Sequence, residues 1–356
     1  MTKYYRIANG FTYKCFVLFI VTGFFSMVSL AQSVKKSNVH IGLIYPISTN
    51  GTNAAQYSNH LSLHALVGVS RSETGFAAAG FGLVILDSAK GVQAAGYFNH
   101  IGKSASGAQL AGFVNHIRNE ANGLTAAGFL NVIGTGNSTQ LAGFGNLSLR
   151  GGNGNGVQLA GFINTAGDVH TQIAGFINVA KKVRGIQLSG FINIADSSEY
   201  PIGIVNIIKN GEKSLSVSID ETTTTLLSFR SGGRRLYGIL GVGYNFKGTN
   251  PLYALEAGIG AHFPVSKNFL INTEAVHVNL SDFKKGDYWK AGLRVYPAFK
   301  LGERFELFGG PTISFVRYTK DLGKDLTDHY LWSETNSSNE FHGIFIGAIA
   351  GLQVKL

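Results

Sequence analysis

The chain has 356 residues, of which 45% are hydrophobic and only 14% charged, and it contains 47 Gly but only 6 Pro. An average globular chain has about 25% charged residues and about 7% Gly, and this chain is too apolar to be a disordered linker protein. Abundant Gly together with Val, Ile, Phe and Tyr predicts β-structure with many turns.

Residues 1–31 are predicted to be a secretory signal peptide. Lys3, Arg6 and Lys14 precede an apolar run that begins at Cys15, and Ser29–Ala31 has the small-x-small character of a cleavage site. The alternative is a retained membrane anchor, but the run is short for a spanning helix, which needs about 20 apolar residues. We therefore expect the chain to be exported.

The mature chain would contain no cysteine, because Cys15 is the only one. This excludes a disulfide framework, a thiol nucleophile and a cysteine metal site. Loss of the three basic residues lowers the formal charge from +10 to +7, a balance suited to anionic lipid headgroups. No later stretch reaches 18 uninterrupted apolar residues, so a mature chain that enters a membrane must do so as a barrel.

Residues 32–74 are predicted to form N-terminal strands, and residues 75–208 form a repeat. The repeat has a small residue, a Gly and an aromatic residue at its core, usually preceded by Gln-Leu and followed by Ile-Asn, as in "GVQLAGFIN". A degenerate ninth copy, "PIGIVNII", is centred on Gly203. The core glycines of the other copies are Gly80, Gly96, Gly112, Gly128, Gly143, Gly161, Gly175 and Gly190. A single-strand unit of about 9–11 residues with a short turn would have the length of a tilted membrane-crossing strand.

Charged residues avoid the cores of these units. Between Gly75 and Ala195, no Asp, Glu, Lys or Arg lies within three positions of a core Gly. The charges lie in the connectors or at strand ends, at Asp87, Lys90, Lys103, Arg118, Glu120, Arg150, Asp168, Lys181, Lys182 and Arg184.

Each unit read as a strand has two different faces. With the core Gly as position 0, aliphatic residues at −4, −2, +2 and +4 share one face with it, and Gln −3, Ala −1, Phe +1 and Asn +3 share the other. The unit is nearly palindromic, so antiparallel neighbours would pair Gln with Asn and Ala with Phe. This favours an antiparallel meander. The alternative is a parallel β-solenoid with stacked Asn, in which His100 and His116, which occupy the same repeat position, would also stack.

Residues 209–356 are predicted to be an antiparallel β-meander. In "DYWKAGLRVYPAFKL", Trp289 to Phe299 alternates between an apolar face and a face with Lys290, Gly292 and Arg294. Apolar residues outside with charge and Gly inside are typical of transmembrane barrels. Connectors alternate between short and long, and Asp321–Asn339 is the longest of them. We therefore predict an all-β fold, an antiparallel transmembrane β-barrel of roughly 18 strands that is built partly from the repeats. The alternative is a β-solenoid repeat domain followed by a C-terminal barrel or meander.

The segments "IGLIYPISTNG", "LSLHALVGVS" and "GVQLAGFIN" resemble the surface-repeat outer-membrane proteins of diderm (Gram-negative-type) bacteria. The resemblance covers roughly residues 39 to 356. It implies an outer-membrane or surface location, and it implies no activity and no catalytic residues.

Four charges are candidate lumen-lining residues, because alternation places Glu256, Glu274, Lys290 and Arg294 on inward faces. They are interpreted either as the lining of a pore or, as we favour, as an interior salt-bridge network, because a Phe in every repeat argues against a wide aqueous channel.

No motif indicates an enzyme, a cofactor site or a metal site. "RGGNGNG" lacks the Lys-Ser/Thr of a phosphate loop, and no spacing links Ser314, His277 and Asp282 as a catalytic set. We therefore expect a non-enzymatic outer-membrane or cell-surface protein that contacts outer-membrane lipid and binds no nucleic acid, either a small-solute pore or a structural envelope protein. The alternative is an adhesion or binding solenoid anchored by a C-terminal barrel.

Overall fold

The computed structural model describes residues 34–151, 155–233, 235–247, 252–284 and 286–356. The predicted signal peptide lies outside the described residues. The chain divides into two units, Met1–Lys35 and Lys36–Leu356, and nearly all described residues belong to the second. Within them, no helix is long and apolar enough to cross a membrane. The fold is all-β, as predicted.

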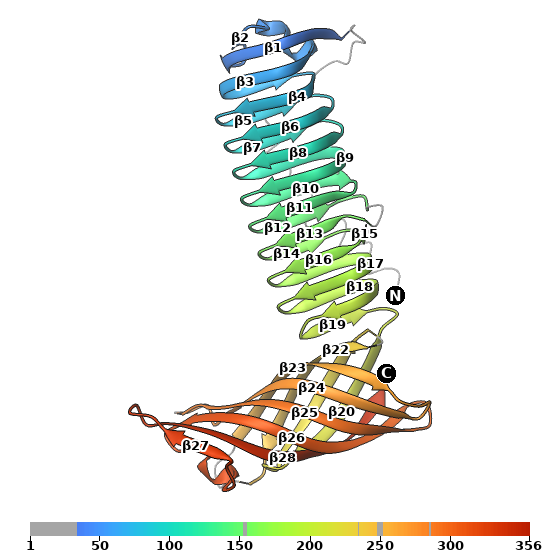
Figure 1. The fold of residues 1–356 in the computed structure, drawn as a ribbon, viewed down its shortest axis with the longest axis vertical. Helices are drawn as coiled ribbons and strands as arrows, with labels where there is room; N and C mark the ends of the chain where they lie inside the picture. Colours follow the sequence, from blue (N-terminus) through green and yellow to red (C-terminus); the bar gives the residue numbers. More distant parts are fainter. Residues whose placement is uncertain (1–33, 152–154, 234, 248–251, 285) are drawn as a thin grey trace. The chain divides into compact units, whose positions relative to one another are not determined.

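The repeats form a β-solenoid, seen in Figure 1 as a stack of short parallel arrows coloured blue to yellow-green. One sheet contains β4, β6, β8, β11, β13 and β16, and the other contains β5, β7, β10, β12, β14 and β19; the longer strands β3, β9, β17 and β18 contribute to both. Strands β1 and β2 pair antiparallel and lie beside β3. A short 3-10 helix, η1, precedes β3 in the chain. The bounds are β1 Lys35–Ile44, β2 Ile47–Ser48, η1 Gly51–Gln56, β3 Tyr57–Ser70, β4 Ser72–Ala79, β5 Gly82–Ile85, β6 Ala89–Ala95, β7 Phe98–Ile101, β8 Ala105–Ala111, β9 Val114–Ala127, β10 Leu130–Thr135, β11 Ser138–Ala142, β12 Gly145–Ser148, β13 Val157–Ala160, β14 Ile163–Thr165, β15 Asp168–Val169, β16 Thr171–Ala174, β17 Ile177–Ser189, β18 Ile192–Ile202 and β19 Val205–Ile208.

Each core Gly lies at a corner between the two sheets. β6 ends at Ala95, Gly96 and Tyr97 form the corner, and β7 begins at Phe98. A Cβ added to Gly96 would lie 2.0 Å from the carbonyl oxygen of Gly80 in the preceding coil. At the position of Gly96 the coils stack too closely for any side chain, and this explains why Gly recurs at the core of the units.

The repeats pair parallel and in register, and this corrects the expectation that they supply antiparallel strands to the barrel wall. Equivalent residues stack along the solenoid, as Asn99 does on Asn115 and His100 on His116. The antiparallel pairing that the near-palindrome suggested does not form, because each unit bends at its Gly and forms two strands of one coil. Like residues therefore meet like residues, as in the alternative solenoid fold, which the structure confirms.

The C-terminal strands form a closed antiparallel barrel. Eight of them follow one another around the wall, and β20 pairs with β28 to close it. The barrel strands are β20 Glu212–Asp220, β21 Thr224–Gly232, β22 Leu236–Asn245, β23 Leu252–Pro264, β24 Phe269–Ser281, β25 Tyr288–Leu301, β26 Phe305–Thr319 and β28 Glu340–Lys355. The predicted antiparallel barrel is thus confirmed, but with fewer strands than the 18 expected, because the repeats do not join it.

Alternation along the barrel strands follows the predicted pattern. In β25, exposed residues from Trp289 to Phe299 alternate with buried residues from Tyr288 to Ala298. The segment Asp321–Asn339, predicted to be the longest connector, contains a 3-10 helix η2 (Lys324–Leu326) and a short strand β27 (Trp332–Thr335) that pairs with β28. Leu322 and Leu326 are buried in it and pack with residues of the barrel interior.

Candidate functional site

The barrel lumen holds a network of buried charges. Glu274 accepts from Arg230 at 2.8 Å and from Arg294 at 3.3 Å, and Arg294 also pairs with Glu256 at 2.7 Å. Tyr237 and Tyr296 donate their hydroxyl protons to Glu274. Four side chains from β21, β22 and β25 therefore converge on the Glu274 carboxylate of β24, and Glu256 of β23 joins the network through Arg294.

Lys290 belongs to a second cluster in the same lumen. Its ammonium group pairs with Asp220 and lies 3.4 Å from Glu221. The structure therefore places Glu256, Glu274, Lys290 and Arg294 inside the wall, with each charge paired.

Sequence reasoning missed Arg230, Asp220 and Glu221. Arg230 had a detectable signal, because Thr224, Leu226, Ser228 and Arg230 alternate as the buried face of β21.

The lumen is filled along its length. Around the charge network, one apolar cluster includes Tyr288 and Phe345 together with Leu326 of the long connector, and another includes Leu270 and Phe308. A remaining space lined by Arg230, Tyr237 and His262, among other residues, has a volume of about 10 Å³, roughly that of one water-sized probe. Eight-stranded barrels are just wide enough for side chains to fill them, and this one is filled.

The three catalytic residue types are not brought together. Ser314 is buried on the lumen side of β26, whereas His277 lies on the outer face of β24 beside Trp289, with ring centroids 4.8 Å apart. Asp282 lies in an exposed loop that follows β24. Among the described residues, no group of three or more His, Cys, Asp or Glu side chains could hold a metal ion.

Inside the solenoid, buried amides form continuous ladders. Each Asn at position +3 donates to the next Asn Oδ1 at 2.9–3.0 Å, in an unbroken series from Asn99 to Asn206. Its second N–H donates to a backbone carbonyl of the next coil at 2.7–2.9 Å. Gln side chains at −3 form a second, interrupted ladder, which includes Gln172 on Gln158 at 2.8 Å. The solenoid interior therefore contains two rows of amides that hydrogen-bond along the stack, beside an apolar row that includes Ile101 and Ile117.

Outside the solenoid, aromatic rings at position +1 stack along the corners. From Phe81 to Phe191, neighbouring rings have centroids 4.8–5.2 Å apart and interplanar angles of 3–15°. Most of these rings are exposed, and Phe162 retains 41% of its accessible surface. We call this row of rings the aromatic edge.

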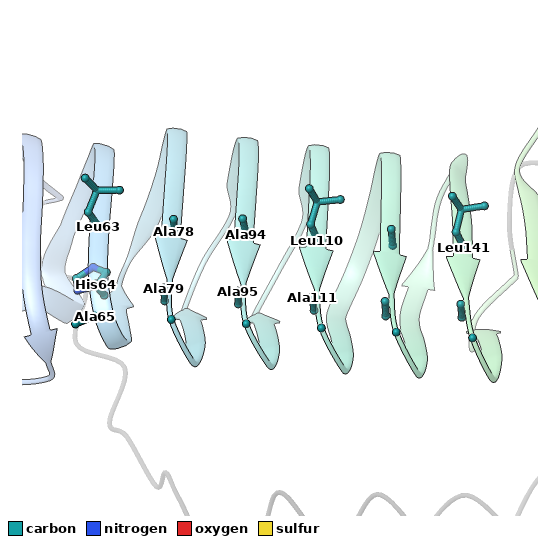
Figure 2. A pocket seen from close by; sticks show the side chains of 18 of the residues that line it. Leu63, His64, Ala65, Ala78, Ala79, Ala94, Ala95, Leu110, Ala111 and Leu141 are labelled. Atoms are coloured by element: carbon teal, nitrogen blue, oxygen red, sulfur yellow. The ribbon is translucent and has the colours of Figure 1, made fainter.

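Next to the aromatic edge, an apolar groove of about 1220 Å³ crosses the sheet that contains β4, β6, β8, β11, β13 and β16. Figure 2 shows side chains from successive strands in two rows, with Leu63, Ala78, Ala94 and Leu110 in one row and Ala79, Ala95 and Ala111 in the other. The corner glycines complete the lining, and His64 is the one lining residue with a titratable side chain. The groove offers apolar contact and almost no polar partner.

The predicted stacking of His100 and His116 is present, with ring centroids 4.9 Å apart and their Nδ1 atoms 2.9 Å apart. Burial lowers the pKa of His116 to about 4, and His100 and Arg118 contribute because a second positive charge there is unfavourable. The pKa of His100 is lowered mainly by burial as well. Both rings are therefore neutral at neutral pH.

This pair predicts a loss of solenoid stability in mild acid. Between pH 6.5 and about 4, His116 is protonated in the unfolded chain but remains neutral in the folded chain. The free energy of unfolding therefore falls as the pH is lowered through this window. We expect hydrogen exchange of the solenoid amides to accelerate across the window. The double variant His100→Val/His116→Val, which carries the residue found at Val132 and Val179, should show a weaker dependence. Equal pH dependence in both proteins would contradict the prediction.

Comparison with known proteins adds little. No model of a protein family matches the chain, and no curated protein matches it. Among solved structures, the chain is similar to a designed protein described under "De novo design of transmembrane beta-barrels", with 14% identity, coverage of 41% of this chain and 93% of that chain, and a TM-score of 0.25. A TM-score this low supports no inference.

Proposed function

We propose that this chain is a non-enzymatic outer-membrane protein whose barrel is a closed, non-conducting anchor and whose solenoid is a binding module. The outer surface of β25 carries the argument for the anchor. From Trp289 to Phe299 its outward side chains are uncharged. The ten intervals between these residues, at about 3.4 Å each and tilted by about 40°, span about 26 Å, close to the apolar band of about 25 Å on such barrels.

Aromatic residues at both ends of the barrel support this reading. Trp289 and Tyr253 lie toward one end of their strands, and Phe263 and Phe299 lie toward the other, all of them exposed. Girdles of aromatic residues mark the two lipid–water interfaces of outer-membrane barrels. The predicted signal peptide and the resemblance of the repeat to surface-repeat proteins are in keeping with this location.

The filled lumen supports an anchor rather than a pore. A small-solute channel needs a continuous water-filled path, and here the paired charges of Glu274, Arg230 and Arg294 occupy the lumen between two apolar clusters. The purified full chain should give no ion conductance in planar bilayers across voltage and salt concentration. Stable conductance steps would overturn the non-conducting anchor.

Deletion of two coils tests the separation of anchor and module. Removal of residues 97–128 joins one corner to an equivalent corner, because Gly96 and Gly128 occupy the same repeat position. We expect the shortened chain to keep the heat-modifiable gel migration of a folded barrel, since the barrel begins at β20. Loss of that migration, with the full chain as the control, would show that the repeats are part of the wall.

A further inference from the structure

The outer surface of the solenoid is apolar on both sides of the aromatic edge. Positions −4, −2, +2 and +4 point outward and are aliphatic or small in most coils, while Gln −3 and Asn +3 are buried. Exposed side chains such as Leu141, Leu159 and Ile173 adjoin the aromatic edge and the groove. Soluble proteins rarely expose contiguous apolar surface on this scale. Apolar surface of this kind marks a site of contact with a membrane or another protein.

The charges are confined to the opposite edge of each coil. From Gly75 to Ala195, every charged residue is at least six positions from the nearest core Gly, with Lys90 and Arg184 among the nearest. The set is basic, because it contains seven Lys or Arg and three Asp or Glu. We call this side the basic edge.

The separation of the two edges matches one leaflet of a membrane. Four residues from the corner, the reach of the aliphatic positions, correspond to about 13 Å. The hydrocarbon of one leaflet is half of a core about 30 Å thick, or about 15 Å. Six residues correspond to about 20 Å, so the basic edge would lie at the headgroups when the aromatic edge is near the middle of the bilayer.

The backbone at the aromatic edge is suited to hydrocarbon. Gly96 N–H donates to Ala79, and Tyr97 and Phe98 N–H both donate to the carbonyl of Phe81, at 2.8–3.2 Å. The same pattern recurs at Gly112 and the following corners. Irregular backbone is excluded from lipid because its N–H and C=O groups lack hydrogen-bond partners there. At these corners, the N–H groups of the Gly and of the two residues after it are all hydrogen-bonded.

We propose that the solenoid is a lipid-binding module that enters one leaflet of an anionic membrane with its aromatic edge, so that acyl chains pack along the groove and the basic edge contacts the headgroups. The charge complementarity of the basic edge selects anionic lipid, and the matching depth selects one leaflet rather than a spanning arrangement. A second copy of the chain would cover the apolar faces equally well. Contact with a second copy would not explain, however, why the distance from the aromatic edge to the charged residues matches the depth of the lipid headgroups. This inference rests on the proposed binding role of the solenoid, and it does not depend on the barrel being the anchor.

Single labels on the full chain test the insertion. In a Cys15→Ser background the chain has no cysteine, so Phe162→Cys, Leu159→Cys, Lys103→Cys and Leu293→Cys each carry one fluorescent label. The protein is reconstituted in vesicles of phosphatidylcholine and phosphatidylglycerol. Nitroxide lipids then report contact with acyl chains, and iodide reports contact with water.

The labels at Phe162 and Leu159 should be quenched severalfold more by nitroxide lipids than the label at Lys103, and less by iodide. Lys103, with a 60% exposed side chain, is the matched position on the basic edge, and Leu159 repeats the test should Phe162→Cys disturb the ring stack. Replacing phosphatidylglycerol with phosphatidylcholine should weaken the lipid quenching at both positions. Labels at Phe162 and Leu159 that respond like the one at Lys103 would overturn the proposal.

Two further outcomes are distinguishable. Labels that are shielded from both quenchers, with cross-links between Phe162→Cys chains, would assign the surface to a second copy and overturn lipid binding. The label at Leu293, which is on the outer face of β25, tests the barrel anchor separately. If it is not quenched by lipid, the proposed anchor fails, and the Phe162 and Leu159 labels still decide the solenoid inference.

Discussion

Replacement of Glu274 by Gln is expected to destabilise the barrel by about 3–5 kcal/mol, the usual cost of removing one partner from a buried charge network. Glu274 is 2% exposed and neutralises both Arg230 and Arg294. The amide keeps the shape of the side chain but leaves two buried guanidinium groups facing one carboxylate, Glu256. The change should appear as a lower urea midpoint for heat-modifiable migration of the protein in detergent micelles.

Two controls separate charge from packing. Leu293→Ala, on the outer face of the neighbouring strand, removes more atoms but no charge, and its effect in detergent should be small. The double variant Glu274→Gln/Arg230→Gln restores the charge balance and should recover much of the lost stability. A double variant as unstable as the sum of the two single variants would contradict the idea that charge pairing in the lumen stabilises the barrel.

The barrel could be predicted from the sequence because buried and exposed residues alternate with a period of two along most of each strand. Trp289 to Phe299 and the inward-facing Glu256 are assigned to the correct faces by that rule alone. What the rule does not provide is register across the barrel. The bond between Arg230 in β21 and Glu274 in β24 joins strands that are not neighbours, so it depends on the tilt and closure of the wall.

The solenoid was only partly readable. The separation of the aliphatic positions from Gln −3 and Asn +3 into two faces is correct, but Phe +1 does not share the buried face of Gln and Asn. Its assignment failed because Gly 0 and Phe +1 both lie at the corner between two strands, where the alternation of a strand does not apply. Pairing by complementarity could not detect this, since a near-palindrome satisfies both parallel and antiparallel neighbours. The shared repeat position of His100 and His116 was the better signal, because like residues stack only in a solenoid.

Replacement of Asn164 by Leu is expected to open the solenoid locally, with a loss on the order of 3 kcal/mol, because several buried polar groups would lose their partners and each costs about 1–3 kcal/mol. Asn164 accepts from Asn146 at 2.9 Å, and it donates to Asn178 at 3.0 Å and to the carbonyl of Ile173 at 2.8 Å. Leu is similar in size, so the loss comes from hydrogen bonding rather than from a cavity. Coils contact only their neighbours, so hydrogen exchange should accelerate in β13, β14, β16 and β17 and remain slow in β6 and β8.

The neighbouring residue supplies the control for the Asn ladder. Thr165 follows Asn164 in β14 but points outward, so Thr165→Leu adds the same side chain without touching the ladder and should leave exchange unchanged. Heat-modifiable migration should be normal in both variants, since the ladder and the barrel are separate parts of the fold. Slow exchange throughout the solenoid of Asn164→Leu would mean that the stacked Phe rings and the backbone ladders hold the coils together without the amides. The Asn of every repeat would then determine register more than stability, a role that a buried polar residue is known to have in coiled coils.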